Sequence, residues 1–421
     1  MGLLDFLKRI EPDKKESPLL HTAYDAFFTF AYSPDSTTKG GVHIKDGMDL
    51  KRTMIHVVLA MQLCYVFGTY NIGHQHFDAM GMYPGFLEGF HLKLSHGLIK
   101  LLPIFIWTHV VGLGIEFWFA YKKGHAVEEG FLVSGALIPL IMPPDIPIWM
   151  LCVAVAFAVV IGKEAFGGTG MNIWNVALLA RVFVFFAYPT TISGDNVWVS
   201  GFADATGAMS LSPGSVTDYS WWHTGLFNGL FEWMGVDIFK EGAVMDGYSG
   251  ATPLALAYQG GWENVTNTFS QSQLWWGTIP GSIGETSKPL ILLGAAFLLL
   301  TRIASWRIMF SMVLGAISMS MLLNMWGATP FMDVPWYFQF YLGSFFFAMA
   351  FMATDPVTAA STNTGKWVYG FLIGFIGMIV RVLNPAYPEG WMLSILFLNT
   401  FAALIDHYVL ESNMKKRLAS A

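Results

Sequence analysis

Charge and cysteine are scarce in this sequence. Of its 421 residues, only 12% are charged, while 54% are hydrophobic and 16% are aromatic. A soluble domain carries about 25% charged residues, so this composition excludes an ordinary soluble protein and is typical of a polytopic membrane protein. The formal net charge of −6 comes without a basic stripe that could follow a phosphate backbone, which excludes a nucleic-acid partner.

Only two cysteines occur, Cys64 and Cys152, and both lie inside apolar runs far apart in the chain. This excludes a self-contained iron–sulfur cluster, and we interpret the pair as small buried hydrophobic residues rather than a disulfide. The glycines at 167–170 have no lysine after them, so they do not form a phosphate-binding loop. The N-terminal stretch carries charges where a signal peptide needs apolar residues, and we expect residues 1–52 to form a cytoplasmic arm.

Apolar runs long enough to cross a membrane are abundant, and we predict each to be a transmembrane helix. They lie near residues 53–71, 97–121, 147–162, 171–188, 289–306, 308–326, 336–353, 367–381 and 391–410. A further run, 131–142, is short and ends in MPPDIP, so we predict a half-helix broken inside the bundle. The sequence thus predicts about ten membrane segments in an all-α protein.

Basic residues predict the orientation of these spans, because loops rich in Lys and Arg remain in the cytoplasm. The basic residues that flank the spans are Lys8, Arg9, Lys14, Lys15, Lys51, Arg52, Lys122, Lys123, Arg302, Arg307, Lys366, Lys415, Lys416 and Arg417. They place both termini in the cytoplasm and the loop at 189–288 outside. The predicted parts are therefore the arm, a first membrane repeat (53–188), this outer loop, a second membrane repeat (289–410) and a cytoplasmic tail (411–421).

The two membrane halves share a weak internal repeat. MPPDIPIW at 142–149 and MATDPVTAASTNTGKW at 352–367 each combine a proline break with entry into a long apolar span. Each half holds five spans, an odd number, so the two repeats must be inverted relative to each other. In transporter folds, paired breaks of this kind lie near the membrane midplane, where freed backbone groups bind solutes or ions.

Three acidic residues lie inside apolar spans, where an ionisable group costs several kcal/mol and has a functional role by default. Glu116, Asp355 and Asp406 carry oxygen ligands that suit a hard cation such as Na⁺. In the alternative interpretation each pairs with a neighbour or reaches the interface, and for Asp406, near the end of the last span, both interpretations stay open. Arg181 and His407 also lie in spans, and we interpret His407 as an interfacial histidine.

Asn172 and Asn175 lie three residues apart, and we predict that they share one face of a helix. Two carboxamides on one face offer paired donors and acceptors that match a planar ring bearing amide groups, such as a flavin. Alternatively, they form hydrogen bonds with a neighbouring helix, as polar residues in membranes often do. The HQHFD run at 74–78 is similar to a metal-binding pattern, but two histidines beside aromatic residues indicate a metal only weakly.

The run DGYSGATPL at 246–254 lies in the Gly-rich outer loop. Its glycines and Ser249 are typical of a turn, and Pro253 is expected to block a helix. Such a loop would present the Thr252 hydroxyl to an external enzyme. An ordinary turn between two spans is the alternative.

Many blocks in fixed order, spread over nearly the whole chain, resemble the B subunits of bacterial Na⁺-translocating NADH:quinone oxidoreductases. Among them are GLLDFLKRIEP, EEGFLVSGALIPLIMPP, KEAFGGTGMNIWN, FFAYPTTISGD, DGYSGAT, FMATDPV and RVLNPAYPEGWML. The resemblance implies an inverted-repeat fold similar to urea transporters, a bacterial inner-membrane location and a role in a redox-driven sodium pump. It also implies the partners of that pump: its other subunits, a flavin transferase, Na⁺, and ubiquinone or menaquinone.

The same resemblance implies which residues hold the flavins. In the family, FMN is joined through a phosphoester to the threonine of a short motif, which matches Asp246, Gly247, Ser249, Gly250, Ala251 and Thr252. The family also binds riboflavin without a covalent bond, and its paired asparagines match Asn172 and Asn175.

Ion and quinone positions follow from the resemblance as well. The acidic residues that the family uses in Na⁺ uptake match Glu116, Asp355 and Asp406. A Gly-Gly step near the family's quinone site falls on Gly112 and Leu113, followed by Gly114. This departure from the family pattern leaves the exact quinone pocket open.

Two other functions are compatible with parts of the sequence. The RnfD protein of the related Rnf complex also carries FMN on a threonine, but the long charged arm with DLKR favours the quinone reductase. A passive urea- or formate-like channel would share the scaffold, yet a channel needs no flavin acceptor. The sequence has no NADH-binding motif. Residues 203–243 look like an insertion, and its Trp and Phe residues suggest that it packs on the membrane or on a partner.

Overall fold

The computed structural model describes residues 10–12, 21, 24, 28, 50–123, 130–192, 195–201, 250–384 and 390–420. Within these ranges the chain forms helices and turns without a strand. Six helices among the described residues are long and apolar enough to cross a membrane: Arg52–Ala79, Phe90–Lys123, Ile148–Phe166, Trp306–Trp326, Asn363–Leu383 and Trp391–Ser420. The predicted class, an all-α polytopic membrane protein, is confirmed.

The first half of the bundle contains five main helices. They are α3 (Leu50–Ala79), α4 (Phe90–Lys123), α5 (Phe131–Ile141), α6 (Ile148–Gly162) and α7 (Val176–Ala187). Short helical turns at Glu164–Phe166, Pro189–Ile192 (α8) and Asp195–Trp198 follow α6 and α7. As predicted, α5 is only 11 residues long and ends at the proline-rich break, because Pro143 and Pro144 have no backbone N–H to continue a helix.

The second half repeats this order. It contains α13 (Lys288–Leu300), α14 (Trp306–Trp326), a broken segment made of η5 (Phe338–Phe340), α15 (Phe345–Phe347) and the π-helical turn η6 (Ala348–Met352), then α16 (Asn363–Leu383) and α17 (Trp391–Ser420). Between the halves lie α11 (Pro253–Thr268) and α12 (Gln271–Trp276).

Three predicted spans are shorter than the sequence indicated. The span expected near 289–306 ends at Leu300. The prediction of a continuous span at 336–353 was wrong, because a turn at 341–344 with Gly343 at φ 62 interrupts it. The helix expected at 171–188 begins only at Val176, because Asn175 caps its N-terminus. Each half therefore holds one half-helix that stops inside the bundle, α5 in the first and η6 in the second.

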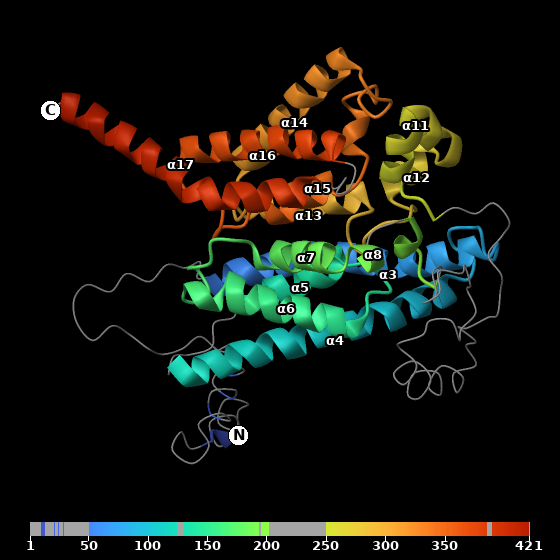
Figure 1. Ribbon diagram of the computed structural model, residues 1–421. Helices are drawn as coiled ribbons and strands as arrows, with labels where there is room; N and C mark the ends of the chain where they lie inside the picture. Colours follow the sequence, from blue (N-terminus) through green and yellow to red (C-terminus); the bar gives the residue numbers. More distant parts are fainter. Residues whose placement is uncertain are drawn as a thin grey trace.

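Figure 1 shows α3 to α7 as one layer and α13 to α17 as the other. Inside the first layer α4 packs on α6 and α6 on α7, and inside the second α14 packs on α16 and α16 on α17. Across the layers α3 contacts α13, and α7 contacts α17. These contacts agree with two five-element repeats, whose inverted relation stays a prediction.

Glycines let helices pack closely in both layers, and the second layer gives an example. A Cβ atom added at Gly374 of α16 would lie 2.0 Å from the Met312 carbonyl oxygen of α14. Glycine there lets the two backbones approach directly, as small residues do in membrane bundles. The helices α11 and α12 lie at the end of the bundle opposite to the C-terminus (Figure 1).

Candidate functional site

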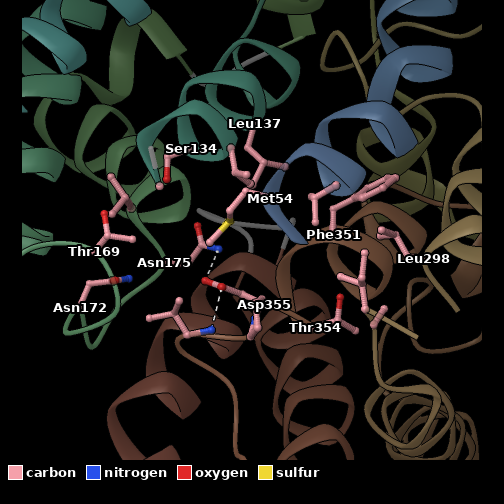
Figure 2. Close-up of a pocket in the computed structure, with 18 of the residues that line it drawn as sticks. Met54, Ser134, Leu137, Thr169, Asn172, Asn175, Leu298, Phe351, Thr354 and Asp355 are labelled. Atoms are coloured by element: carbon pink, nitrogen blue, oxygen red, sulfur yellow. Dashed lines mark hydrogen bonds between the residues drawn. The ribbon is translucent and has the colours of Figure 1, made fainter. Parts of the chain in front are cut away.

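A small cavity of about 50 Å³ lies between the two halves (Figure 2). Its walls come from Met54 of α3, from α5, from the 163–176 connection, from α13 and from the break at 350–357. Ser134, Thr169, Asn172, Asn175 and Asp355 supply polar groups to it, together with Lys163. Both half-helices thus contribute residues to one site.

Asn175 connects the two halves across this cavity. As the N-cap of α7, its Oδ1 accepts hydrogen bonds from the backbone N–H of Ala177 (3.1 Å) and Leu178 (3.2 Å). Asparagine is a favoured N-cap because its short side chain reaches the free N–H groups of the first turn. The remaining amide Nδ2 donates to Asp355 Oδ2 at 3.3 Å, and Figure 2 shows the two side chains pointing toward each other.

Asn172 also lines the cavity but lies outside α7. Its Nδ2 donates to the Trp174 carbonyl oxygen at 3.1 Å. The prediction that Asn172 and Asn175 share one helix face was therefore wrong. Asn175 is the N-cap of α7, which begins at Val176, so Asn172 precedes the helix. A Gly-rich turn before α7, rather than helix periodicity, brings the two carboxamides to the same cavity.

Asp355 lies at the second break, where its donors among the described residues are neutral. Val357 N–H donates to Oδ1 at 3.1 Å, and Thr358 Oγ1 and Asn175 Nδ2 donate to Oδ2 at 3.0 and 3.3 Å. None of the ion pairs found in the described part of the chain includes this carboxylate. Carboxylate oxygens are a ligand type that suits a hard cation such as Na⁺, so Asp355 keeps its place as a candidate ion ligand.

Glu116 of α4 has a different environment. It forms a buried ion pair with Lys163, which follows α6, and the two side chains are 3% and 4% exposed. The pair corresponds to the alternative in which an intramembrane acid binds a neighbour, although the partner is not the nearby Lys122. Lys163, which sequence reasoning missed, reaches the cavity while Glu116 does not line it.

Asp406 of α17 lies away from the cavity and caps α16. Its carboxylate accepts from the backbone N–H groups of Ser361 (2.6 Å) and Thr362 (3.0 Å). Thr362 is itself the N-cap of α16. Of the three predicted Na⁺ residues, only Asp355 lies in the wall of the cavity.

Thr252 is the N-cap of α11 and is half-buried. Its Oγ1 accepts from the Ala255 N–H at 3.2 Å, and Pro253 occupies the first helical position. The expectation that Pro253 blocks a helix was wrong, because proline at the first position begins one. Gly250 and Ala251 precede it, whereas Asp246, Gly247, Ser249 and the insertion at 203–243 lie outside the described residues.

Gly112 and Gly114 of the predicted quinone region line neither the cavity between the halves nor the larger one beside α4. Gly112 packs on the Phe131 ring, and Gly114 has nothing within 4 Å of an added Cβ. One turn earlier, His109 lines a second cavity of about 610 Å³ between α3, α4 and α5. Gln62, Tyr65 and Thr69 lie in the same wall, and their spacing of three and four residues along α3 was the signal that could have indicated it.

The HQHFD run has structural partners. His76 Nδ1 lies 2.8 Å from the Ser200 carbonyl oxygen, and its ring stacks on His96 at 3.9 Å. His74 stacks on Tyr70 instead. In the part of the chain that the structure describes, no three His, Cys, Asp or Glu residues are grouped to hold a metal.

A family model described as the NQR2, RnfD, RnfE family matches residues 37–415. The chain belongs to this family. A relative from Ectopseudomonas mendocina, named as the B subunit of Na⁺-translocating NADH-quinone reductase, is 41% identical over 444 residues, covering 100% of this chain and 99% of the relative. A protein of the same name from Azotobacter vinelandii is 41% identical, covering 100% of this chain and 99% of the relative. Another from Chromohalobacter salexigens is 41% identical, covering 99% of this chain and 96% of the relative. The family resemblance noted in the sequence is confirmed.

The polar groups of the cavity between the halves match those of a flavin, but the volume of the cavity is small. Its carboxamides and hydroxyls match the donors and acceptors on the edge of an isoalloxazine ring. Its volume of about 50 Å³ holds a few water molecules at about 10–15 Å³ each, or a cation with part of its hydration shell. The cavity as described is therefore too small to hold a flavin ring.

Proposed function

We propose that this chain is the flavin-carrying membrane subunit of a redox-driven sodium pump that passes electrons from NADH to a membrane quinone. The observation that carries the proposal is the full-length similarity to proteins named as subunits of such an enzyme, joined to an intramembrane carboxylate, Asp355, held by neutral donors between two half-helices. Electrons reach the chain through other subunits of the complex, which also bind it in a bacterial inner membrane.

Covalent FMN is proposed on Thr252. The hydroxyl lies at the N-terminus of the first segment of α11, which is interrupted at Gly260 and Gly261, and the free N–H groups of that first turn can donate to a phosphate. A phosphoester formed there by a flavin transferase would keep its negative charge at this helix end. The position of α11 opposite to the C-terminus (Figure 1) supports an outer location if the C-terminus is cytoplasmic.

Riboflavin is proposed at the cavity of Asn172 and Asn175 in a conformation more open than the one described. The two carboxamides would orient the ring, and Thr169 and Ser134 offer hydroxyls nearby. A bound flavin would supply one-electron transfer. The carboxylate of Asp355 in the same wall would hold Na⁺ close to that redox centre.

The test of this function is flavin content. Thr252→Ala should abolish covalent flavin, because the phosphoester needs a hydroxyl, while Ser249→Ala keeps at least part of it. Covalent flavin survives in a denaturing gel, where the band fluoresces under ultraviolet light, and mass analysis of the tryptic peptide locates it. FMN on any other residue would refute the assignment to Thr252.

Two alternatives give different results in the same assay. A passive urea-like channel that shares the scaffold would remain unlabelled even when it is co-expressed with a flavin transferase. An RnfD protein belongs to the same family and would be labelled, but it would assemble with subunits that do not reduce quinone with NADH. Quinone reduction by the purified complex separates the two.

A further inference from the structure

Asn399 is a buried polar residue in the apolar run SILFLNTFAALI of α17, which is one of the candidate membrane spans. Its exposed fraction is 3%, and a buried amide in a membrane bundle costs free energy unless it forms hydrogen bonds. The hydroxyl of Tyr369, a fully buried residue of α16, lies 2.5 Å from this amide. The two residues form a polar pair inside the second half.

One orientation of the Asn399 amide satisfies both of its ends. In that orientation the nitrogen donates to the Tyr369 oxygen and, at 3.1 Å, to the Ile395 carbonyl oxygen. The amide oxygen then accepts from the backbone N–H of Asn175 at 3.2 Å. Because a carboxamide donates and accepts at the same time, Asn399 links its own half of the bundle to the N-cap of α7 in the other half.

The neighbouring residues form a second hydrogen bond between the same two segments. Trp174 Nε1 donates to Thr400 Oγ1 at 3.0 Å, and Thr400 follows Asn399 in α17. The Trp174 ring also packs edge-on against Phe166, with the ring centroids 5.6 Å apart. The connection that leads into α7 is therefore fixed to α17 at two consecutive residues.

Asn175 carries this contact onward to the candidate ion ligand. Its Oδ1 is occupied by the first turn of α7, and its Nδ2 donates to Asp355 Oδ2 at 3.3 Å, a bond drawn in Figure 2. Among the described residues, Asn175 is the donor to Asp355 that comes from the first half. With its backbone held by Asn399 and its side chain held by the helix, the Asn175 amide donates in a fixed direction.

α17 also supports the far end of the segment that carries Asp355. Asp406 accepts from the backbone N–H groups of Ser361 and Thr362, which follow the break. Neither Asn399 nor Tyr369 is in the wall of the cavity between the halves. These two residues are therefore placed to act on Asp355 through Asn175 rather than to touch an ion.

We infer that Asn399 and Tyr369 are positioning residues for Asp355 and that they act through Asn175. Their role rests on the proposed function, in which Asp355 binds Na⁺, and it adds the residues that set the affinity of that site. A ligand that is already held in its binding geometry loses less freedom when the ion arrives, and residues behind a metal ligand tune its affinity in this way. Loss of the Asn399 amide should therefore weaken Na⁺ binding without removing a ligand.

Titration of quinone reduction with Na⁺, in the purified whole complex, tests this role. Asn399→Ala should raise the Na⁺ concentration for half-maximal activity about three- to tenfold, the effect of one lost hydrogen bond, while the KM for quinone stays unchanged. Tyr369→Phe keeps the bond between Asn399 and Asn175, so its shift should have the same direction and a smaller size.

Tyr369→Phe removes a single hydroxyl and keeps the packing of the ring, so it extends the test to the case in which Asn399→Ala does not assemble. A wild-type Na⁺ titration in Asn399→Ala would overturn the positioning role. The same titration in Tyr369→Phe would overturn it where Tyr369→Phe is the variant that assembles. A rise in the KM for quinone equal to the Na⁺ shift would show a general defect and would also overturn it.

Ser394→Ala is the matched control. Ser394 lies in the same helix, is 1% exposed and donates to the Trp391 carbonyl oxygen at 2.8 Å, so its hydrogen bond stays within α17. The Na⁺ titration of this variant should match that of the wild type. A shift as large as that of Asn399→Ala would show that any polar loss in α17 disturbs the site, and would contradict a specific contact to Asn175.

A double-mutant cycle tests whether Asn399 acts through Asp355. Effects of residues that work through one group are not additive, whereas those of independent residues add. Asn399→Ala combined with Asp355→Asn should therefore need no more Na⁺ than Asp355→Asn alone. Additive shifts would show a path that does not include Asp355 and would overturn the role.

The outcomes separate the positioning role from the proposed function. If the wild-type complex does not reduce quinone with NADH in response to Na⁺, the proposed function fails. If Asp355→Asn shifts the Na⁺ titration and Asn399→Ala does not, the positioning role alone fails. If Asp355→Asn leaves the titration unchanged, Asp355 is not an ion ligand and Asn399 has no ion site to position.

Discussion

Asp145 and Asp355 both lie where an apolar half-helix stops inside the bundle, yet their partners differ in charge. Asp145, after α5, accepts from Lys100 Nζ at 2.7 Å, Ser200 Oγ at 3.3 Å and Gly201 N–H at 2.5 Å. Among the described residues, the donors to Asp355, after η6, are Asn175, Thr358 and Val357. The first carboxylate is paired with a fixed ammonium, whereas the donors that the structure shows for the second are neutral groups of the described chain.

This difference in partner charge predicts different consequences of substitution. A buried ion pair contributes little net stability, but the loss of one partner leaves a desolvated charge and is strongly destabilising. Replacing a carboxylate held by neutral donors with an amide lowers the stability far less, because some of the hydrogen bonds can be kept. Substitution at the three carboxylates of Asp145, Asp355 and Glu116, or at their partners, should therefore give different kinds of defect.

The largest effect is expected at the most buried pair. Lys163→Met removes the ammonium that binds Glu116, whose side chain is 3% exposed, and should lower the free energy of unfolding by about 3–5 kcal/mol. Thermal unfolding of the purified complex measures it. The double variant Lys163→Met, Glu116→Gln should recover most of the loss, and no recovery would show that packing rather than charge causes the defect.

Lys100→Met should destabilise the break after α5 somewhat less, by about 3 kcal/mol. The Asp145 side chain is 25% exposed, and it keeps the donors of Ser200 and Gly201. The same melting assay applies, with Asp145→Asn added as the compensating change. We expect no change in the dependence of activity on Na⁺ in Lys100→Met. A shifted Na⁺ dependence would contradict the purely structural role that we assign to the Lys100–Asp145 pair.

Asp355→Asn should change function with little loss of stability, about 1 kcal/mol or less. The amide keeps the shape of the side chain but removes the charge, so about tenfold more Na⁺, equivalent to about 1.4 kcal/mol of binding free energy, should be needed for half-maximal quinone reduction. Flavin content should remain normal. A variant that assembles well and shows the wild-type Na⁺ titration would remove Asp355 from the ion path.

The smallest effects are expected for the two asparagines. Asn175→Ala removes the N-cap of α7 and the contact to Asp355, which should cost about 1 kcal/mol of stability and lower the content of non-covalent riboflavin. Asn172→Ala removes one bond to the Trp174 carbonyl and should affect only riboflavin. Flavin extracted from each purified variant is compared, and equal riboflavin in both variants and the wild type would place that flavin elsewhere.

Some of the site could be predicted from the chain itself. Asn175 precedes the apolar run VALLARV, and Thr252 precedes Pro253, and both are sequence patterns of a helix N-terminus. These signals were outweighed by the longer apolar run at 171–188 and by the interpretation of Pro253 as a helix breaker. The N-terminal ends of these two helices could thus have been predicted from local residues alone.

By itself, the sequence determined the membrane class, the proline breaks after α5 and η6 and the family, because hydropathy, proline chemistry and residue order are properties of local segments. Only the tertiary structure decided which acid has which partner. Glu116 meets Lys163 across 47 residues, and Asp355 meets Asn175 across 180. Such contacts depend on how the two halves pack, and the same packing surrounds Asp355 with the neutral donors of the described residues and forms the cavity behind α5.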